Sequence, residues 1–326
     1  MMQQSDFNAV KISERVYWVG AIDWSIRDFH GYSTRRGTTY NAYLVMGEKV
    51  ILVDTVRAPF KDELLSRIAS VVDPKRIDYI ISNHSEMDHS GCLAKLIELV
   101  QPERVFASAM GVKTLTDHFN LGQGIQVVKD GERIRLGNVD LVFAETRMLH
   151  WPDSMVTYLP DDALLFSQDA FGMHLASSER FDDEISGDLL KFEAGKYYAN
   201  ILMPFSALVA KLPEKLKQNG IAPKIIAPDH GPIWRRGVAT ILEWYERWAA
   251  RRPARKAVIV YDTMWGSTHR MARAIEEGLT DGGVSTKLLK LGANHRSDAA
   301  TELLDAGALL VGSPTINNGI FPTVAD

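Results

Sequence analysis

The segment 84–89 carries four side chains that can bind metal ions: His84, Glu86, Asp88 and His89. Core packing gives no reason to gather two imidazoles and two carboxylates in six residues, because charged groups of this kind are seldom buried without a partner. Imidazole and carboxylate together suit iron, zinc or manganese. The segment therefore predicts a metal site.

Three more candidate ligands lie further along the chain, namely His150, Asp169 and His230. Each stands near the end of a predicted strand, and strand ends that meet at one edge of a sheet are where α/β proteins place their sites. A carboxylate such as Asp169 can bridge two cations, which lie about 3.5–4 Å apart in two-metal sites. Any one of these residues alone is more often an ordinary surface or core residue, but together they predict two metal ions.

The elements that position these side chains form a strand-rich α/β unit in the first 250 residues or so. Apolar runs and alternating patterns predict strands at Val16–Trp24, Tyr40–Met46, Val50–Asp54, Ile77–Ser82, Val105–Ser108, Val139–Glu145, Met155–Leu159, Leu164–Ser167 and Lys224–Ala227. Helical spacing predicts helices at Phe60–Val72 and Gly91–Val100, a long helical region from about Leu189 to Gln218, and a helix at Ala239–Arg251.

A charged, proline-containing break at Arg251–Arg255 divides the chain. After it, strands at Ala257–Tyr261, Val284–Leu291 and Ala308–Val311 alternate with helical segments, one of them at Arg270–Leu279. This alternation predicts a parallel sheet. We therefore expect two domains, at residues 1–252 and 256–326.

Two loops of the second domain have the character of a phosphate and flavin site. The first follows a strand and opens a helix, so that its backbone N–H groups and hydroxyls can surround a phosphate; it consists of Thr263, Met264, Trp265, Gly266, Ser267 and Thr268. This loop resembles the phosphate loop of flavodoxins. The second resembles the flavodoxin loop beside the flavin ring and contains Ser313, Pro314, Thr315, Asn317, Asn318 and Gly319. Each loop alone is also compatible with an ordinary turn, but the pair predicts flavin mononucleotide (FMN).

The composition and net charge of the chain indicate which class of protein it belongs to. Of 326 residues, 46% are hydrophobic and 24% charged, as in globular proteins with a sizeable core. The net charge of −4 does not call for nucleic acid or a membrane surface as a partner. No apolar run approaches the roughly 18 residues of a membrane span, and the N-terminus does not resemble a signal peptide, so we expect a cytoplasmic protein. The single cysteine, Cys92, excludes an internal disulfide and a cysteine-ligated cluster within this chain, and we interpret it as a core residue.

The metal segment, the strand before it and the later His, Asp and His resemble the metallo-β-lactamase fold. Zinc hydrolases of that superfamily carry His-x-His-x-Asp-His, whereas this chain has Glu86 in place of the second His. The added oxygen donor and negative charge favour iron. Together with the flavodoxin-like loops, this variant resembles the flavodiiron proteins (A-type flavoproteins). Four further stretches are similar to that family: Asp28–Gly31, Leu149–Ser154, Phe166–Gly172 and Tyr197–Ile201.

The resemblance implies an α/β protein, with an N-terminal metallo-β-lactamase-like αβ/βα sandwich followed by a flavodoxin-like doubly wound parallel sheet. Three of the five strands of such a sheet are recognisable, so we expect the native chain to continue beyond Asp326.

Residue by residue, the resemblance implies that His84, Glu86 and His150 hold one iron. Asp88 and His230 would hold the other, with Asp169 bridging, while His89 either binds the second iron or stands aside. His30 and Tyr198 would line the pocket over the irons, where they donate hydrogen bonds or protons; the alternative is a packing role for both. The remaining histidines, His118, His174, His269 and His295, match no ligand position and are interpreted as structural or solvent-facing.

The implied activity is reduction of dioxygen to water, of nitric oxide to nitrous oxide, or of both, at a non-haem diiron site supplied with electrons by FMN. The resemblance also implies an external electron donor, rubredoxin or a flavin reductase, and a head-to-tail homodimer or a dimer of dimers. Two alternatives remain. A dinuclear zinc hydrolase would have His at position 86, and a non-catalytic flavin carrier would not need the seven ligands.

Overall fold

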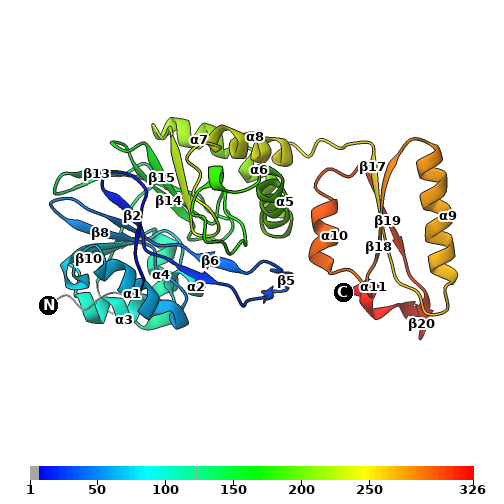
Figure 1. The fold of residues 1–326 in the computed structure, drawn as a ribbon, viewed down its shortest axis with the longest axis horizontal. Helices are drawn as coiled ribbons and strands as arrows, with labels where there is room; N and C mark the ends of the chain where they lie inside the picture. The colour runs from blue at the N-terminus through cyan, green and yellow to red at the C-terminus, as the bar shows by residue number, and fades with distance from the viewer. Residues whose placement is uncertain (1–6, 122–123) are drawn as a thin grey trace.

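The computed structural model describes residues 7–121 and 124–326. The N-terminal domain contains two β-sheets packed face to face, with helices on both outer faces (Figure 1). The first sheet has the strand order β1 (Val10–Lys11), β2 (Val16–Trp18), β7 (Tyr43–Val45), β8 (Val50–Val53), β9 (Ile77–Ser82), β10 (Arg104–Ala107) and β11 (Ile125–Val127). The second has the order β12 (Arg133–Leu136), β13 (Val139–Glu145), β14 (Met155–Leu159), β15 (Leu164–Gln168) and β16 (Ile225–Pro228).

Alternation along the strands explains the layering. In β8, Ile51 and Val53 point into the core between the two sheets, whereas Val50 and Leu52 point to the outer face. Successive side chains of a strand lie on opposite faces, so an unbroken apolar run suits a strand buried on both sides. The predicted αβ/βα sandwich is confirmed.

Helices cover the outer faces of both sheets. The first sheet is covered by α1 (Lys61–Ala69), α3 (Leu93–Val100) and α4 (Ala109–Phe119), and the short α2 (Met87–Ser90) lies in the metal segment. The second sheet is covered by α5 (Gly187–Tyr197), α6 (Ser206–Val209), α7 (Leu212–Gln218) and α8 (Val238–Ala249). On α1, Leu64 and Ile68 are one helical turn apart and fully buried, as the helical spacing predicts.

Several predicted elements are interrupted. The expected strand Val16–Trp24 is two strands, β2 and β3 (Ala21–Asp23), because β2 pairs with β7 in the first sheet and β3 pairs with a separate strand at Thr38–Tyr40. A Cβ on Gly20 would lie 2.3 Å from the carbonyl oxygen of Tyr40, so only glycine allows this approach. The expected strand Tyr40–Met46 is likewise β6 (Thr38–Tyr40) followed by β7. The predicted long helical region is confirmed as a series of helices, in which a π-helical turn at Tyr198–Leu202 and a 3₁₀ turn at Met203–Phe205 separate α5 from α6.

A short hairpin beside the metal segment was not predicted. It consists of β4 (Asp28–Phe29) and β5 (Tyr32–Ser33). His30 and Gly31 form its two-residue turn with positive φ angles of 52° and 86°, the conformation that two-residue hairpin turns require. This turn places the His30 side chain at the tip of the hairpin.

The C-terminal domain has a parallel sheet with the strand order β18 (Ser285–Lys290), β17 (Lys256–Tyr261) and β19 (Ala308–Gly312). Helices α9 (Ser267–Asp281) and α10 (Arg296–Glu302) lie on opposite faces of this sheet, and α10 faces the N-terminal domain (Figure 1). A hairpin, β20 (Thr315–Ile316) with β21 (Gly319–Ile320), and α11 (Pro322–Ala325) follow β19. The predicted flavodoxin-like arrangement is confirmed. Across the described residues, no helix combines the length and the apolar character that a membrane span requires.

Candidate functional site

The neighbouring strands β8 and β9 and a buried hydrogen-bond network position the metal segment. Strand β9 ends at Ser82, and the next residue, Asn83, donates to the Asp54 carboxylate from its backbone N (2.7 Å) and its side-chain Nδ2 (2.8 Å). The side-chain oxygen of Asn83 accepts a hydrogen bond from Thr157 on β14 at 2.6 Å. Both sheets therefore hold the residue that precedes His84.

Four predicted ligands form a first group: His84, Glu86, His150 and Asp169. Nε2 of His150 lies 2.9 Å from Oδ2 of Asp169 and 3.3 Å from Oε2 of Glu86. Nε2 of His84 lies 3.2 Å from the same oxygen of Glu86 and 3.3 Å from Oδ2 of Asp169. Two imidazole nitrogens and two carboxylates thus converge on one point, as a metal ion requires.

The second group consists of Asp88, His89 and His230. Oδ2 of Asp88 lies 3.2 Å from Nε2 of His230 and 3.3 Å from Nε2 of His89. The other oxygen of Asp169, Oδ1, faces this group and lies 3.2 Å from Nε2 of His89 and 3.6 Å from Nε2 of His230. The structure therefore brings together all seven predicted ligands, with Asp169 between the two groups.

The second ring nitrogen of three histidines faces a fixed acceptor. Nδ1 of His84 lies 3.3 Å from Asp153, Nδ1 of His89 lies 3.6 Å from Asp229, and Nδ1 of His230 lies 2.6 Å from the carbonyl oxygen of Thr39. Such partners fix the orientation of a metal-binding imidazole and raise its basicity. Sequence reasoning missed Asp153 and Asp229. Each lies within three residues of a predicted ligand, His150 or His230, but only the tertiary structure reveals the histidine that it contacts.

The charges of the site depend on one another. Burial lowers the pKa of His84, but hydrogen bonds to Asp153 and Asp169 outweigh burial and leave this pKa well above its usual range. Burial would raise the pKa of Asp169, but hydrogen bonds from His150 and His84 bring it well below the usual value. Burial raises the pKa of Asp229, and the nearby Asp54 carboxylate raises it further. The protein alone thus places carboxylates and imidazolium groups in contact, an arrangement in which cations can displace the protons.

The donor set fits two metal ions because some of its buried atoms lie close to one another but form no hydrogen bond. Among the residues that the structure describes, both carboxylate oxygens of Asp88, Nε2 of His89 and Oδ1 of Asp169 form no hydrogen bond. Burying unpaired polar and charged atoms is costly, and coordination to a cation removes that cost. The number of carboxylates and imidazoles in contact also matches a two-metal site.

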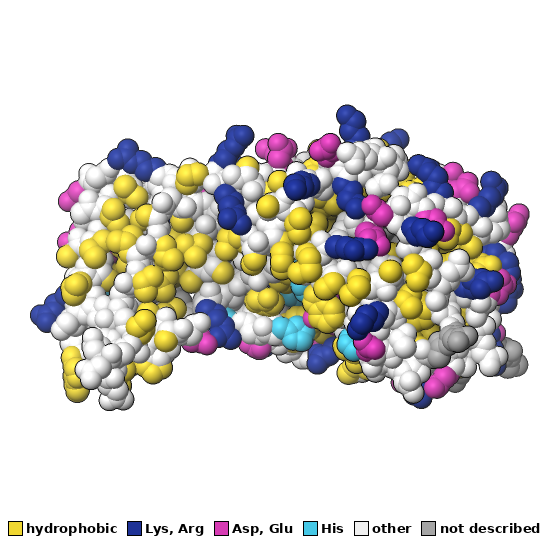
Figure 2. Space-filling model, turned by 180° about the vertical axis from the view of Figure 1, so that it is seen from behind, with side chains coloured by type: hydrophobic (Ala, Val, Ile, Leu, Met, Phe, Trp, Pro, Cys, Tyr) yellow, Lys and Arg dark blue, Asp and Glu magenta, His cyan; other side chains and the backbone are white. Residues whose placement is uncertain are grey.

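A pocket of about 240 Å³ opens over the two groups. Besides five of the ligands, its lining contains Phe29, His30, Tyr32, Trp151, His174, Tyr197 and Ile201. Nε2 of His30 lies 3.4 Å from Oε1 of Glu86, and the His30 side chain is 63% exposed, so this histidine stands at the mouth of the pocket as expected. Histidine side chains also reach the surface in the space-filling view (Figure 2).

The prediction that Tyr198 lines the pocket is wrong. Tyr198 is fully buried, donates a hydrogen bond to Ser206 at 3.2 Å and packs against Trp248. Tyr197 lines the pocket instead, because successive residues of a helix point about 100° apart. Burial, followed by the charge of Asp169, raises the pKa of Tyr197 well above 10, so its hydroxyl keeps its proton at neutral pH.

The sequence predicted only a structural or solvent-facing role for His174, but its side chain lines the pocket beside the metal ligands. Its ring packs 4.8 Å from that of His230 and 4.9 Å from that of Tyr197, and its Nδ1 lies 2.9 Å from the Thr38 hydroxyl. Burial, followed by the charge of His230, lowers the pKa of His174 well below its usual value. His174 is therefore a neutral imidazole beside the second ligand group.

The two candidate flavin loops lie together in the C-terminal domain, after adjacent parallel strands. The Thr263 hydroxyl accepts the backbone N–H of Gly266 at 3.0 Å, which closes the first loop before α9. Gly312, directly before the second loop, packs so closely that a Cβ there would lie 3.0 Å from Thr268. Gly266 has open space around the position of a Cβ, so the approach to the α9 N-terminus is clear, as a phosphate group would require. The residues present fit a flavin phosphate.

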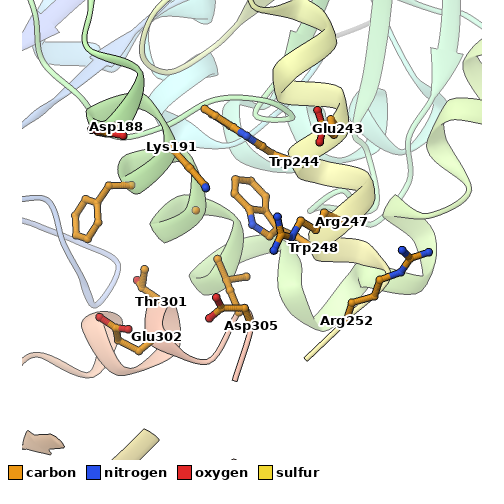
Figure 3. Close-up of a pocket in the computed structure, with 13 residues that line it drawn as sticks. Asp188, Lys191, Glu243, Trp244, Arg247, Trp248, Arg252, Thr301, Glu302 and Asp305 are labelled. Atoms are coloured by element: carbon orange, nitrogen blue, oxygen red, sulfur yellow. The ribbon is translucent and has the colours of Figure 1, made fainter. Parts of the chain in front are cut away.

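A larger groove, of about 480 Å³, lies between the two domains (Figure 3). It is lined by α5, by α8 with Arg252 after it, and by the end of α10 with the residues that follow, and its labelled side chains include Lys191, Trp244, Trp248 and Glu302. It contains none of the predicted metal or flavin residues.

Comparison with known proteins agrees with this geometry. Residues 38–231 match the ODP family beta lactamase, and residues 259–325 match the flavodoxin family. The chain is 49% identical to a nitric oxide reductase of Moorella thermoacetica over 319 residues, which is 97% of this chain and 80% of that protein. It is also 49% identical to the rubredoxin-oxygen oxidoreductase of Megalodesulfovibrio gigas over 321 residues, with the same coverage.

Solved structures give the same result. The rubredoxin oxygen:oxidoreductase from Desulfovibrio gigas superposes with a TM-score of 0.96 over 98% of this chain and 80% of that one, at 49% identity. The flavodiiron protein of Giardia intestinalis gives a TM-score of 0.93 at 34% identity, over 98% of this chain and 78% of that one. A chain with this fold, these seven converging ligands and these relatives belongs to the flavodiiron protein family.

Proposed function

We propose that this flavodiiron protein reduces dioxygen to water, nitric oxide to nitrous oxide, or both, at two iron ions. The observation that carries the proposal is the position of Asp169, whose two oxygens face the two ligand groups separately. We assign His84, Glu86 and His150 to one iron and Asp88, His89 and His230 to the other, with Asp169 shared. When bound, the irons supply electrons and open coordination positions, and FMN supplies further electrons from its donor.

Glu86 supports a redox site over a zinc hydrolase. Its carboxylate adds negative charge where the hydrolases of this fold carry a neutral imidazole, and this charge favours iron over zinc. The named relatives of M. thermoacetica and M. gigas are a nitric oxide reductase and an oxygen oxidoreductase, and neither name indicates hydrolysis. A non-catalytic flavin carrier is also disfavoured, because such a carrier does not need seven converging ligands.

The side chains over the site supply protons and exclude water. Four electrons and four protons convert dioxygen to two waters, and two of each convert two nitric oxide molecules to nitrous oxide and water. Tyr197 keeps its proton inside the pocket, and His30 stands at the pocket mouth, in contact with Glu86. We propose that both residues donate hydrogen bonds or protons toward the reacting gas. Phe29 and Ile201 form the apolar part of the lining and limit the entry of water.

We propose FMN in the loops of residues 263–268 and 313–319, and a domain boundary between α8 and β17. The flavin loops lie at the C-terminal edge of the β18–β17–β19 sheet, whereas α10 is the part of that domain that faces the metal domain (Figure 1). This arrangement supports a head-to-tail homodimer, or a dimer of such dimers, in which the flavin of one chain serves the irons of another. We further propose rubredoxin or a flavin reductase as the electron donor, and a cytoplasmic location.

The test is gas consumption by the purified protein under chemical reduction of its flavin. We expect catalytic consumption of dioxygen or nitric oxide, with water or nitrous oxide as product, and loss of this activity after iron is removed by chelation. Hydrolysis of an ester or lactam without consumption of either gas would overturn the proposal.

A further inference from the structure

The two domains of the chain meet at the hairpin that carries His30. The first turn of α10, Arg296–Asp298, lies against β5. The Ser297 hydroxyl accepts the backbone N–H of Ser33 at 3.2 Å and lies 3.0 Å from the Ser33 hydroxyl. Ser297 is 1% exposed, so these contacts are shielded from solvent.

Charged groups surround the same contact. Asp298 pairs with Arg35 at 2.5 Å, just beyond the end of β5, and with Lys196 of α5 at 3.3 Å. Nζ of Lys196 also donates to the Ser33 hydroxyl at 2.6 Å. Lys196 is buried and only 18% of the Asp298 side chain is exposed, so solvent screens this pair less than a surface pair. The Arg35 side chain is 66% exposed. Asp298 therefore contacts both the chain that leaves the hairpin and the helix beside it.

The opposite side of the hairpin reaches into the metal pocket. Phe29 lies in the pocket lining, with its ring 5.2 Å from the ring of His174, and His30 approaches Glu86. At the turn between the strands, Arg296 packs so closely that its Nη2 lies 2.9 Å from where a Cβ on Gly31 would stand. One face of this short hairpin thus contacts α10 while its tip covers the candidate diiron site.

Besides the hairpin, α10 contacts α5 and the π-helical turn Tyr198–Leu202. Beyond its first turn, α10 borders the groove of about 480 Å³, and Thr301, Glu302 and Asp305 line that groove opposite Trp244 and Arg247 (Figure 3). The polar contacts between α10 and the N-terminal domain are therefore made by its first turn. They reach Ser33 and Arg35 at the hairpin, Lys196 of α5, and Asn200, whose Nδ2 donates to the Ser297 carbonyl oxygen at 3.1 Å.

We infer that Ser297 and Asp298 of the flavin-binding domain are positioning residues for the candidate diiron site, because they hold the β4–β5 hairpin and thereby place His30 over the pocket. This inference rests on the proposed function for its effect on turnover, but the positioning itself does not depend on that function. A two-stranded hairpin is marginal alone, so external contacts decide how often it opens.

Hydrogen exchange of the full-length protein tests the positioning directly. In Asp298→Asn, we expect the amides of Gly31 and Tyr32, which do not contact Asp298, to exchange roughly tenfold faster than in the wild type. Arg35→Gln should produce the same acceleration, and the double variant should add little to it. Glu302→Gln is the matched control, because Glu302 belongs to α10 but pairs with Lys256 and Lys287 inside its own domain.

Gas turnover by the same variants is a second measurement of the positioning role of Asp298. If Asp298 acts through His30, Asp298→Asn should lower turnover in the wild type but have little further effect in a His30→Ala background. Unchanged hairpin exchange in Asp298→Asn, or fully additive losses of turnover, would overturn the inference. If Asp298→Asn accelerates amide exchange in the hairpin but the wild-type protein consumes neither gas, the positioning role stands and only the proposed function is contradicted.

Discussion

Nε2 of His150 lies 2.9 Å from Oδ2 of Asp169, while the other oxygen of that carboxylate faces His89. Because Asp169 is shared between the two ligand groups, Asp169→Asn should disturb both metal ions. We expect the iron content to fall from about two per chain to one or fewer. Elemental analysis measures this content, with the surface variant Asp140→Asn as a control for purification losses. Retention of two irons by Asp169→Asn would contradict the shared position.

Asp153 orients His84 without belonging to either ligand group. Its Oδ2 lies 3.3 Å from Nδ1 of His84 and accepts the backbone N–H of Ser85 at 2.6 Å. Removing such a partner lowers metal affinity about 10- to 100-fold in other sites. We expect a decrease of that size in Asp153→Ala, measured by competition with a chelator. Asp117→Ala, at an exposed ion pair with Lys113, should retain the wild-type affinity; an equal affinity in both variants would refute a role for Asp153.

Tyr197 and Tyr198 are neighbours with different predicted roles. Tyr197→Phe removes the hydroxyl inside the pocket and should lower kcat roughly tenfold, the effect of one lost hydrogen bond to the reacting gas, with little change in stability. Tyr198→Phe removes the hydrogen bond to Ser206 and should leave kcat within about twofold while lowering the free energy of unfolding by about 1 kcal/mol. Steady-state turnover and thermal unfolding of both variants separate the two roles. The reverse pattern would mean that the pocket assignment is wrong.

The metal-free protein should lose stability as the pH rises. Burial lowers the pKa of His150, but hydrogen bonds to Asp169 and Glu86 outweigh it and raise this pKa to about 9. In the unfolded chain the value is about 6.5. A folded pKa above the unfolded one gives stability that is complete below pH ~6.5 and is lost as the pH rises through ~9.

The measurement is the Tm of chelator-treated protein at pH 6.5 and pH 9. His150→Gln does not carry this titrating group, so its Tm should fall less than that of the wild type over the same interval. Equal decreases in the two proteins would exclude this contribution of His150.

The sequence predicted the strands that long apolar runs define. Strands β9 (Ile77–Ser82) and β13 (Val139–Glu145) have the predicted bounds because each is a mostly apolar stretch between polar residues. The β4–β5 hairpin escaped prediction, since its strands have two residues each and show no periodicity. Helix α4 was also missed, although Ser108 caps it by accepting the N–H of Gly111. The capping serine before the helix was a signal that the sequence offered.

The ligands were predictable because chemistry dictates their residue types and the family motif dictates their spacing. Their supporting groups were not, since Asp153 and Asp229 acquire a role only through contacts with His84 and His89. The sequence assigned Tyr198 to the pocket where the structure has Tyr197, and this error has a geometric cause. A helix turns about 100° per residue, and a π-helical turn begins at Tyr198, so sequence alone does not determine which ring faces the pocket.

The most direct test of the central claim is the metal and flavin content of the purified protein, by elemental analysis and absorption spectroscopy. We predict about two irons per chain, bound by the seven ligands, together with bound FMN. Two zinc ions per chain and no flavin would contradict the assignment and indicate a hydrolase of the same fold.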